Sequence, residues 1–141
     1  MKLENIISVS GKPGLFKVIS KKKNGLVVES IPEGKKLNIF ALDKVSALED
    51  ISIYTYEEDI PLSDVYEKLF KLEGGQESIH HKDDSNKLKD KMLEFMPDYD
   101  QDRVYVSDLK KLFQWYNLLI QANLLGMDEE DKVENTEEEK N

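Results

Sequence analysis

Short apolar runs alternate with turn-forming residues over the first third of the chain. Five runs rich in Ile, Val, Phe and Tyr predict β-strands: NIISVS, GLFKVIS, GLVVES, KLNIFA and ISIYTY. Asn24-Gly25 predicts a two-residue hairpin turn after the second run, because both residues tolerate positive φ. A turn between the first and second runs is predicted at GKPG, residues 11–14. The hairpin between the third and fourth runs is expected to hold Gly34 in the left-handed conformation.

The second run carries apolar side chains on both faces of its predicted strand. Leu15 and Ile19 alternate with Phe16 and Val18, so neither face has the polar pattern of a solvated sheet. This favours a small closed barrel over an open sheet with one apolar face. Residues 42–50, LDKVSALED, are expected to form a single helical turn before the last strand. We predict an SH3-like five-stranded β-barrel for residues 1–56; the alternative is an OB-type barrel, which usually has longer strands and an added helix.

Helical spacing replaces the strand pattern over residues 57–126. Ser63 is expected to cap a first helix over DVYEKLFKLE, with Asp64 in its first turn. A second helix is predicted over NKLKDKMLEFM and stops at Pro97. The last helix is expected to have Ser107 as N-cap and Gly126 as its left-handed C-terminal residue. One of its faces carries apolar side chains and one Asn at helical spacing: Leu109, Leu112, Phe113, Tyr116, Leu119, Ile120 and Asn123.

Charge divides the chain into unlike parts. Residues 1–53 carry nine Lys and six acids, a net charge of +3, whereas residues 54–141 have a net charge of −12. The segment 127–141 holds eight acids and two Lys and too few apolar residues to form a core. We therefore predict an α+β protein: an SH3-like barrel over 1–56, a helical domain of about three α-helices over 57–126, and a disordered acidic tail over 127–141.

The absence of cysteine excludes disulfides and thiolate metal ligands. The apolar stretch after Lys2 is only IISV. A signal peptide needs an apolar stretch of roughly 7–15 residues and a membrane helix one of about 20. We expect a soluble cytoplasmic protein that does not associate with membranes.

The stretch DYDQDRVYVSD, residues 98–108, begins as a calcium loop does, with Asp98, Asp100 and Asp102 at alternate positions. A calcium loop also needs Gly at its sixth position and Glu at its twelfth. Here the sixth residue is Arg103 and the twelfth is Leu109. The stretch is therefore predicted to be a turn in which Arg103 pairs with Asp98 or Asp100.

Other catalytic and metal chemistries have little support in the sequence. His80 and His81 are adjacent, and on an extended segment they would point to opposite sides, which is poor geometry for a shared zinc ion. The chain has neither a G-x-S-x-G nucleophile motif nor a phosphate-binding G-x-x-x-x-G-K-[ST] loop. We predict a protein that is not an enzyme, with no catalytic residue, metal or cofactor, and we expect no small-molecule ligand.

The last helix offers the best candidate for a protein contact. Phe113, Trp115 and Tyr116 fall within four residues, and such aromatic clusters are enriched at protein interfaces. Phe113 and Tyr116 lie on the apolar stripe and are expected in the core, whereas Trp115 points away from it. Trp115, with Leu118 and Gln114, is the predicted partner-binding site.

Lysines near two predicted hairpin tips give an alternative, a nucleic-acid site. If two hairpin tips lie on the same side of a small barrel, the lysines at these tips form one basic patch with Lys12, Lys17 and Lys44. Such a patch could bind the phosphate backbone of a nucleic acid. Arg103 is the only arginine in the chain. This weakens the hypothesis of nucleic-acid binding, because arginine makes most of the contacts that proteins form with nucleic-acid bases. The lysines concerned are Lys21, Lys22, Lys23, Lys35 and Lys36.

Two stretches, MKLENIISVSGKPGLFKVIS and PDYDQDRVYVSDLKKLFQWYNLL, resemble the signature stretches of an uncharacterised bacterial family of domains of unknown function. The resemblance covers about residues 1–125 and implies no reaction or ligand. The predicted barrel also resembles Tudor and KOW-type domains at the level of the fold. The sequence thus predicts a non-enzymatic protein-interaction module or accessory factor that docks on a larger cytoplasmic assembly. The alternative is an RNA- or ribonucleoprotein-binding protein that uses the basic hairpins.

Overall fold

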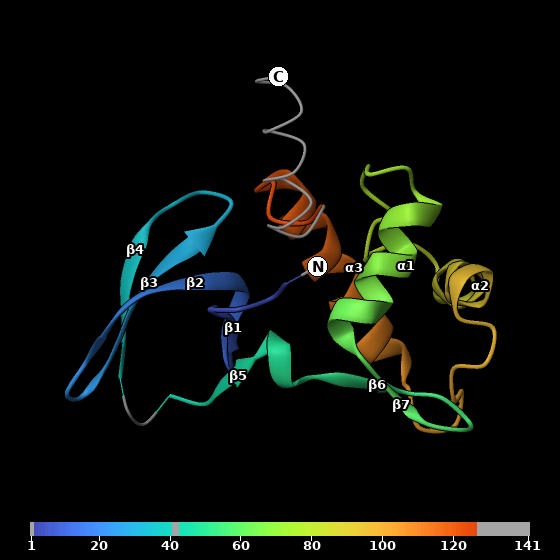
Figure 1. Cartoon of the computed structure of the whole chain (residues 1–141), viewed down its shortest axis with the longest axis horizontal. Coiled ribbons are helices and arrows are strands. Elements are labelled where there is room, and N and C mark those ends of the chain that lie inside the picture. Colours follow the sequence, from blue (N-terminus) through green and yellow to red (C-terminus); the bar gives the residue numbers. More distant parts are fainter. Residues whose placement is uncertain (1, 41–42, 127–141) are drawn as a thin grey trace, which may run out of the picture.

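The computed structural model describes residues 2–40 and 43–126 and places an antiparallel β-sheet beside three helices (Figure 1). The predicted α+β class is confirmed, while the predicted acidic tail, 127–141, lies outside the described residues. The sheet has five strands in the order β4-β3-β2-β1-β5. Their bounds are Ile6–Val9 for β1, Lys12–Lys22 for β2, Gly25–Ile31 for β3, Lys36–Phe40 for β4 and Val45–Ala47 for β5.

The sheet is open, so the predicted closed barrel is wrong. β4 and β5 are its two edges, and within the described residues no pairing joins them. The run 51–56, predicted as the closing strand, instead supplies β6 (Ser52–Tyr54), which pairs with β7 (Asp59–Pro61) in a separate sheet. The helical turn expected within residues 42–50 is confirmed as the 3-10 helix η1, Leu48–Asp50.

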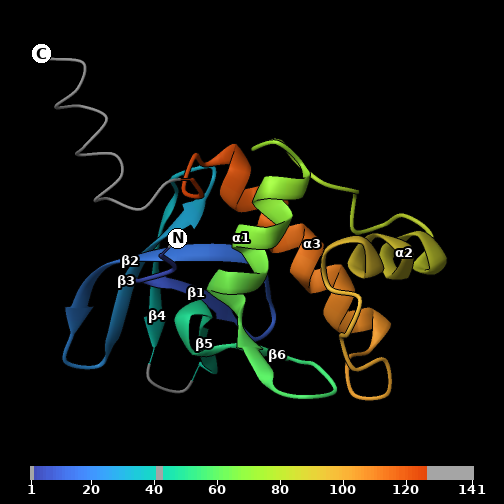
Figure 2. The ribbon, with the colours of Figure 1, turned by 45° about the vertical axis from the view of Figure 1, so that its right-hand side comes forward.

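Both faces of the sheet carry buried apolar side chains although the sheet does not close into a barrel. On one face, Ile7 and Phe16 belong to a small apolar cluster within the sheet. On the other face, Ile6 and Leu15 belong to the main core, which the helices share. Figure 2 shows the helices α1 (Leu62–Leu72) and α3 (Val106–Gln121) beside the sheet and α2 (Ser85–Phe95) on the side of α3 away from it. Helices from distant parts of the sequence therefore cover one face of the sheet, and the apolar side chains on the other face pack against one another.

The predicted hairpins form, but two of their turns lie earlier than expected. Val9 pairs with Lys12, so the first turn is Ser10 and Gly11, and the rest of GKPG belongs to β2. The hairpin predicted at Asn24-Gly25 has its turn one residue earlier. Lys22 pairs with Gly25, so the two turn residues are Lys23 and Asn24, and Gly25 is the first residue of β3. A Cβ at Gly25 would overlap the backbone carbonyl of Ile39 in β4. Glycine is therefore required there by the close approach of two strands and not by positive φ. Gly34 has φ +81°, as predicted for the second hairpin.

The first two helices are α1, Leu62–Leu72, and α2, Ser85–Phe95. Ser63 does not cap α1, because the helix begins one residue before it, where the chain leaves β7 at Pro61. At that point the backbone N–H of Leu62 donates to the carbonyl of Ile51 at 2.9 Å. In α2, the carboxylate of Asp84 accepts from the N–H of Asn86 at 2.7 Å and so caps the helix.

The third helix, α3, runs from Val106 to Gln121 and begins before the predicted cap at Ser107. Its N-cap is Tyr105, whose N–H donates to the Asp108 carboxylate at 2.9 Å. At the other end, Asn123 takes the left-handed conformation with φ 58°. The prediction of Gly126 for that role is wrong, because the helix ends earlier.

One apolar core joins the sheet to the helices. Its residues come from β1, β2, β3 and η1 as well as from all three helices, and they include Leu15, Leu48, Leu69, Leu88, Met92 and Phe113. The core crosses residue 56, where the sequence predicted a domain boundary; that boundary stays a prediction. Among the described residues, no helix is long and apolar enough to cross a membrane.

Candidate functional site

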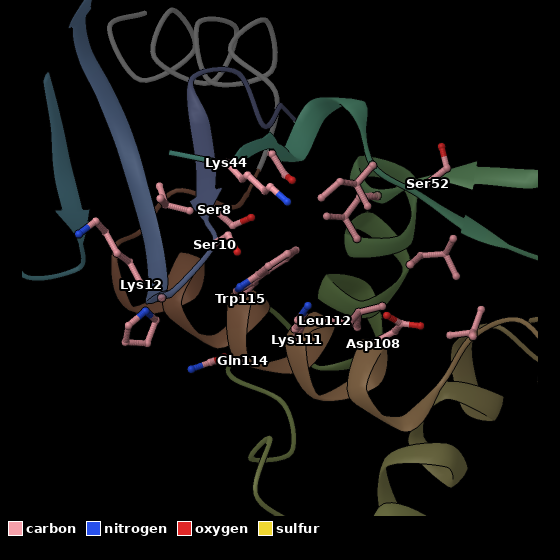
Figure 3. A pocket seen from close by; sticks show the side chains of 18 of the residues that line it. Ser8, Ser10, Lys12, Lys44, Ser52, Asp108, Lys111, Leu112, Gln114 and Trp115 are labelled. Carbon is pink, nitrogen blue, oxygen red and sulfur yellow. The ribbon is translucent and has the colours of Figure 1, made fainter. Parts of the chain in front are cut away.

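A cavity of about 760 Å³ lies where one end of the sheet, β6 and α3 come together (Figure 3). The sheet lines one side with the β1–β2 turn and β5, and α3 lines another with its N-terminal half. Apolar side chains from the segment around β6 complete the wall. The residues that matter for its chemistry are Ser8, Ser10, Lys12, Lys44, Ser46, Ile51, Ser52, Ile53, Arg103, Asp108, Lys111, Leu112, Gln114 and Trp115.

The sheet wall is polar because the helix-facing side of β1 changes character along the strand. Ile6 belongs to the main core, and Ser8, two residues later on the same face, lines the cavity. Ser8 pairs with Ser46 of the edge strand β5, which lines the same wall. Beyond them, the backbone N–H of Ser10 donates to the carbonyl of Lys44 at 2.9 Å and fixes that segment against β1.

The helix wall carries side chains at helical spacing. Asp108, Lys111 and Trp115 lie on one side of α3, next to the buried Leu112. Trp115 is half-buried and packs partly against the main core. Figure 3 shows its indole directed into the cavity from α3, with Lys44 directed inward from the sheet and Lys12 at the edge.

The three residues predicted to bind a partner lie close together on α3, beside the β1–β2 turn. Gln114 lines the cavity together with Trp115, and it also lines a second cavity of about 350 Å³ together with Leu118. Leu118 packs beside the start of β2, since a Cβ on Gly14 in that strand would lie 3.8 Å from its Cδ1. Their role in binding stays a prediction; the structure adds that Trp115 faces a defined cavity.

Positive charge dominates the cavity. Its lining includes Lys12, Lys44, Lys111 and Arg103 but a single carboxylate, that of Asp108. That carboxylate already accepts from the backbone at the start of α3. Within the described part of the chain, neither Lys44 nor Lys111 lies within ion-pair distance of a carboxylate. The cavity therefore favours an anionic ligand.

The sequence did not point to Lys111, Arg103 or the serines as parts of one site. The serines belong to strands that only the tertiary fold brings beside α3. Lys111 could have been found from its spacing, because it lies four residues before Trp115 and so on the same side of a helix.

The predicted turn forms at residues 101–103 and positions Arg103, whereas residues 106–108 already belong to α3. The Nε of Arg103 donates to Asp100 Oδ2 at 2.7 Å, and Asp100 Oδ1 accepts from the N–H of Asp102 at 3.0 Å. The guanidinium also lies 4.3 Å from the centre of the Tyr54 ring, a cation–π contact. These contacts hold Arg103 at the wall of the cavity.

The Asp100–Arg103 pair predicts a pH dependence of stability. The hydrogen bond from Arg103 is the main cause that lowers the pKa of Asp100 below its ordinary value. A lowered pKa contributes stability that is present above the ordinary carboxyl pKa, about 3.9, and is lost as the pH falls through the folded value. We expect the Asp100→Asn variant to lose less thermal stability than the wild type between about pH 4 and pH 2.5, as measured by circular dichroism. Parallel curves for the two proteins would contradict this.

The lysines of the alternative nucleic-acid site are exposed but do not form one patch. Lys21, Lys22 and Lys23 lie at one end of β3, whereas Lys35 and Lys36 lie at the other. β3 has seven residues, which at about 3.3 Å per residue puts the groups roughly 20 Å apart. Consecutive hairpins that share a strand must have their tips at opposite ends, so the expectation that these tips lie on one side is wrong.

The histidines differ from the sequence prediction. His80 and His81 do not point to opposite sides, because their rings stack with centroids 4.5 Å apart. The backbone N–H of Lys82 donates to His80 Nδ1 at 3.1 Å, which marks a tight turn and not an extended segment. Burial lowers the pKa of His81. In the ranges that the structure describes, no group of three His, Asp or Glu side chains could hold a metal ion.

Comparison with known proteins gives two adjoining matches to family models. One, a domain of unknown function designated DUF5606, matches residues 3–48, and another, DUF6852, matches residues 51–119. The solution NMR structure of a Bacteroides vulgatus protein is similar to this chain, with 41% sequence identity and a TM-score of 0.75. The similarity covers 89% of this chain and 90% of that one. No curated protein matches the chain.

Proposed function

Because the chain belongs to a family of domains of unknown function that includes the Bacteroides vulgatus protein, we propose a function from the cavity itself. The protein is a non-enzymatic docking module that binds an acidic segment of a protein partner between the sheet and α3. The observation that carries this proposal is the half-buried indole of Trp115 in a cavity lined by Lys44, Lys111 and Arg103.

The side chains that line the cavity indicate what kind of ligand it binds. The cations favour carboxylates, while Ile51, Ile53 and Leu112 provide apolar surface beside the indole. Aromatic and cationic anchors of this kind supply much of the binding energy in protein interfaces. A segment that combines several acidic side chains with an apolar one satisfies both parts of the wall.

The edge strand β5 favours an extended segment. No strand of the described residues pairs with the outer side of β5, and Ser46 of that strand lines the cavity. An added peptide strand can use such an edge for main-chain hydrogen bonds, with pockets for alternate side chains. The partner's segment is therefore proposed to bind in an extended conformation.

The test uses the single tryptophan of the chain as a reporter, because its emission responds only to the neighbourhood of Trp115. The probe is a nine-residue synthetic peptide with four glutamates on each side of one leucine. We expect it to shift or quench the emission with saturation, and to bind more weakly as salt rises, since salt screens charge pairs. The matched control has lysine in place of each glutamate and is expected to produce no change.

A single-stranded RNA oligonucleotide distinguishes the alternative function. RNA that binds through the hairpin lysines would leave the emission of Trp115 unchanged while forming a complex detectable by gel shift. Absence of any response to the acidic peptide, together with RNA binding, would overturn the docking proposal in favour of the alternative.

A further inference from the structure

The segment that follows α3 has the chemistry that the cavity favours. Residues 127–141 hold eight acids and two Lys, a net charge of −6. The acids form two groups, DEED at 128–131 and EEE at 137–139, with Glu134 between them. Met127 and Val133 add apolar side chains, so the segment combines carboxylates with apolar groups, as the cavity wall does.

The segment is attached close enough to reach the cavity. It follows Leu125, which is buried in the main core at 6% exposure. From Gln121 back to Asp108, the helix that lines the cavity measures about 20 Å at 1.5 Å per residue. A fully extended chain spans about 3.3 Å per residue, so the eight residues that lead from Gly126 to Glu134 can span at most about 26 Å. The attachment also gives the segment a high effective concentration at the cavity.

We propose that residues 127–141 occupy the cavity of their own chain and compete with the acidic segment of a partner. The proposal rests on the proposed function, because it assigns an internal competitor to the same site. Its carboxylates bind Lys44 and Lys111, for which the described residues supply no carboxylate at ion-pair distance. A partner binds only when its segment displaces the internal one, which lowers its apparent affinity and makes docking selective.

The experiment compares the wild-type chain with two variants that have the same net charge as each other. The test variant carries four Glu→Gln substitutions in the part of the segment that can reach the cavity, at Glu134, Glu137, Glu138 and Glu139. The control variant carries four at exposed positions of the described chain and changes the net charge by the same amount: Glu4, Glu49, Glu57 and Glu58. Each protein is titrated with the acidic peptide described above while the emission of Trp115 is recorded.

We expect the test variant to bind the peptide at least about fivefold more tightly than the wild type, within the usual range of coupling between linked sites. Its emission spectrum without peptide should also differ from the wild-type spectrum, and the control should match the wild type in both respects. Equal, measurable affinity in all three proteins would overturn this inference and leave the docking function intact. An absence of binding in all three would overturn both.

The origin of the competing segment is tested by dilution. Competition within one chain does not depend on protein concentration, so the emission spectrum of the wild type without peptide should stay constant over a hundredfold dilution. A spectrum that moves toward that of the test variant on dilution would assign the segment to a second copy and overturn the intramolecular proposal.

Discussion

Replacement of Phe113 by alanine is expected to lower the free energy of unfolding by about 3–5 kcal/mol, the usual effect of removing a large aromatic side chain from a core. Phe113 is fully buried in α3, and its ring meets that of Phe95 in α2 edge-on, with the centroids 6.4 Å apart. The truncation leaves a cavity that neighbouring side chains fill only in part. Urea denaturation, followed by far-ultraviolet circular dichroism, measures the change.

The same substitution tests whether the sheet and the helices form one cooperative unit. The main core contains Leu15 of β2 together with Phe113 of α3, so amide protons of β2 should lose exchange protection in step with those of the helices. The control is Leu93→Ala on the exposed side of α2, where we expect a change within about 0.5 kcal/mol. Retained protection in the sheet after the helices unfold would support separate domains and contradict a single unit.

Reversal of the two cavity lysines, Lys44→Glu with Lys111→Glu, is expected to weaken binding of the acidic peptide about a hundredfold. Close charge pairs across interfaces contribute about 1.5 kcal/mol or more each, and two such pairs account for a change of this size. Both lysines are exposed, so the fold should be retained. Isothermal titration calorimetry measures the affinity, and circular dichroism verifies the fold.

The matched control for this change is Lys21→Glu with Lys22→Glu in the β2–β3 hairpin. It alters the net charge by the same amount, and neither residue lines the cavity. We expect it to change the affinity for the peptide only slightly, through long-range attraction that salt screens. An equal loss in both double variants would mean that overall charge, and not the cavity, attracts the peptide.

Local signals predicted much of the secondary structure. The hairpin before β3, the left-handed Gly34, the helical turn at Leu48–Asp50 and the pairing of Arg103 with Asp100 all depend on neighbouring residues. The closed barrel was wrong because two apolar faces do not reveal what covers them. Ile6 and Leu15 pack into a core formed largely by helices from the second half of the chain, and no local pattern in β1 or β2 carries that information.

The sequence predicted only part of the cavity lining. Trp115 could be singled out because its position on a helix differs from that of the apolar stripe, and its role in binding stays a prediction. Ser8 and Ser46 could not, since an isolated serine on a strand has no local property that marks a cavity. The hairpin lysines were overvalued, because their grouping assumed that two hairpins sharing β3 could place both tips at the same end.

A nitrogen-15 NMR titration of the 141-residue chain with the glutamate-rich peptide tests whether the cavity around Trp115 binds acidic segments. We expect the indole N–H resonance of Trp115 and the amide resonances of Ser8, Ser46 and Lys111 to shift together with one dissociation constant. Shifts confined to Lys21–Lys23 and Lys35–Lys36, with the Trp115 indole unchanged, would contradict it.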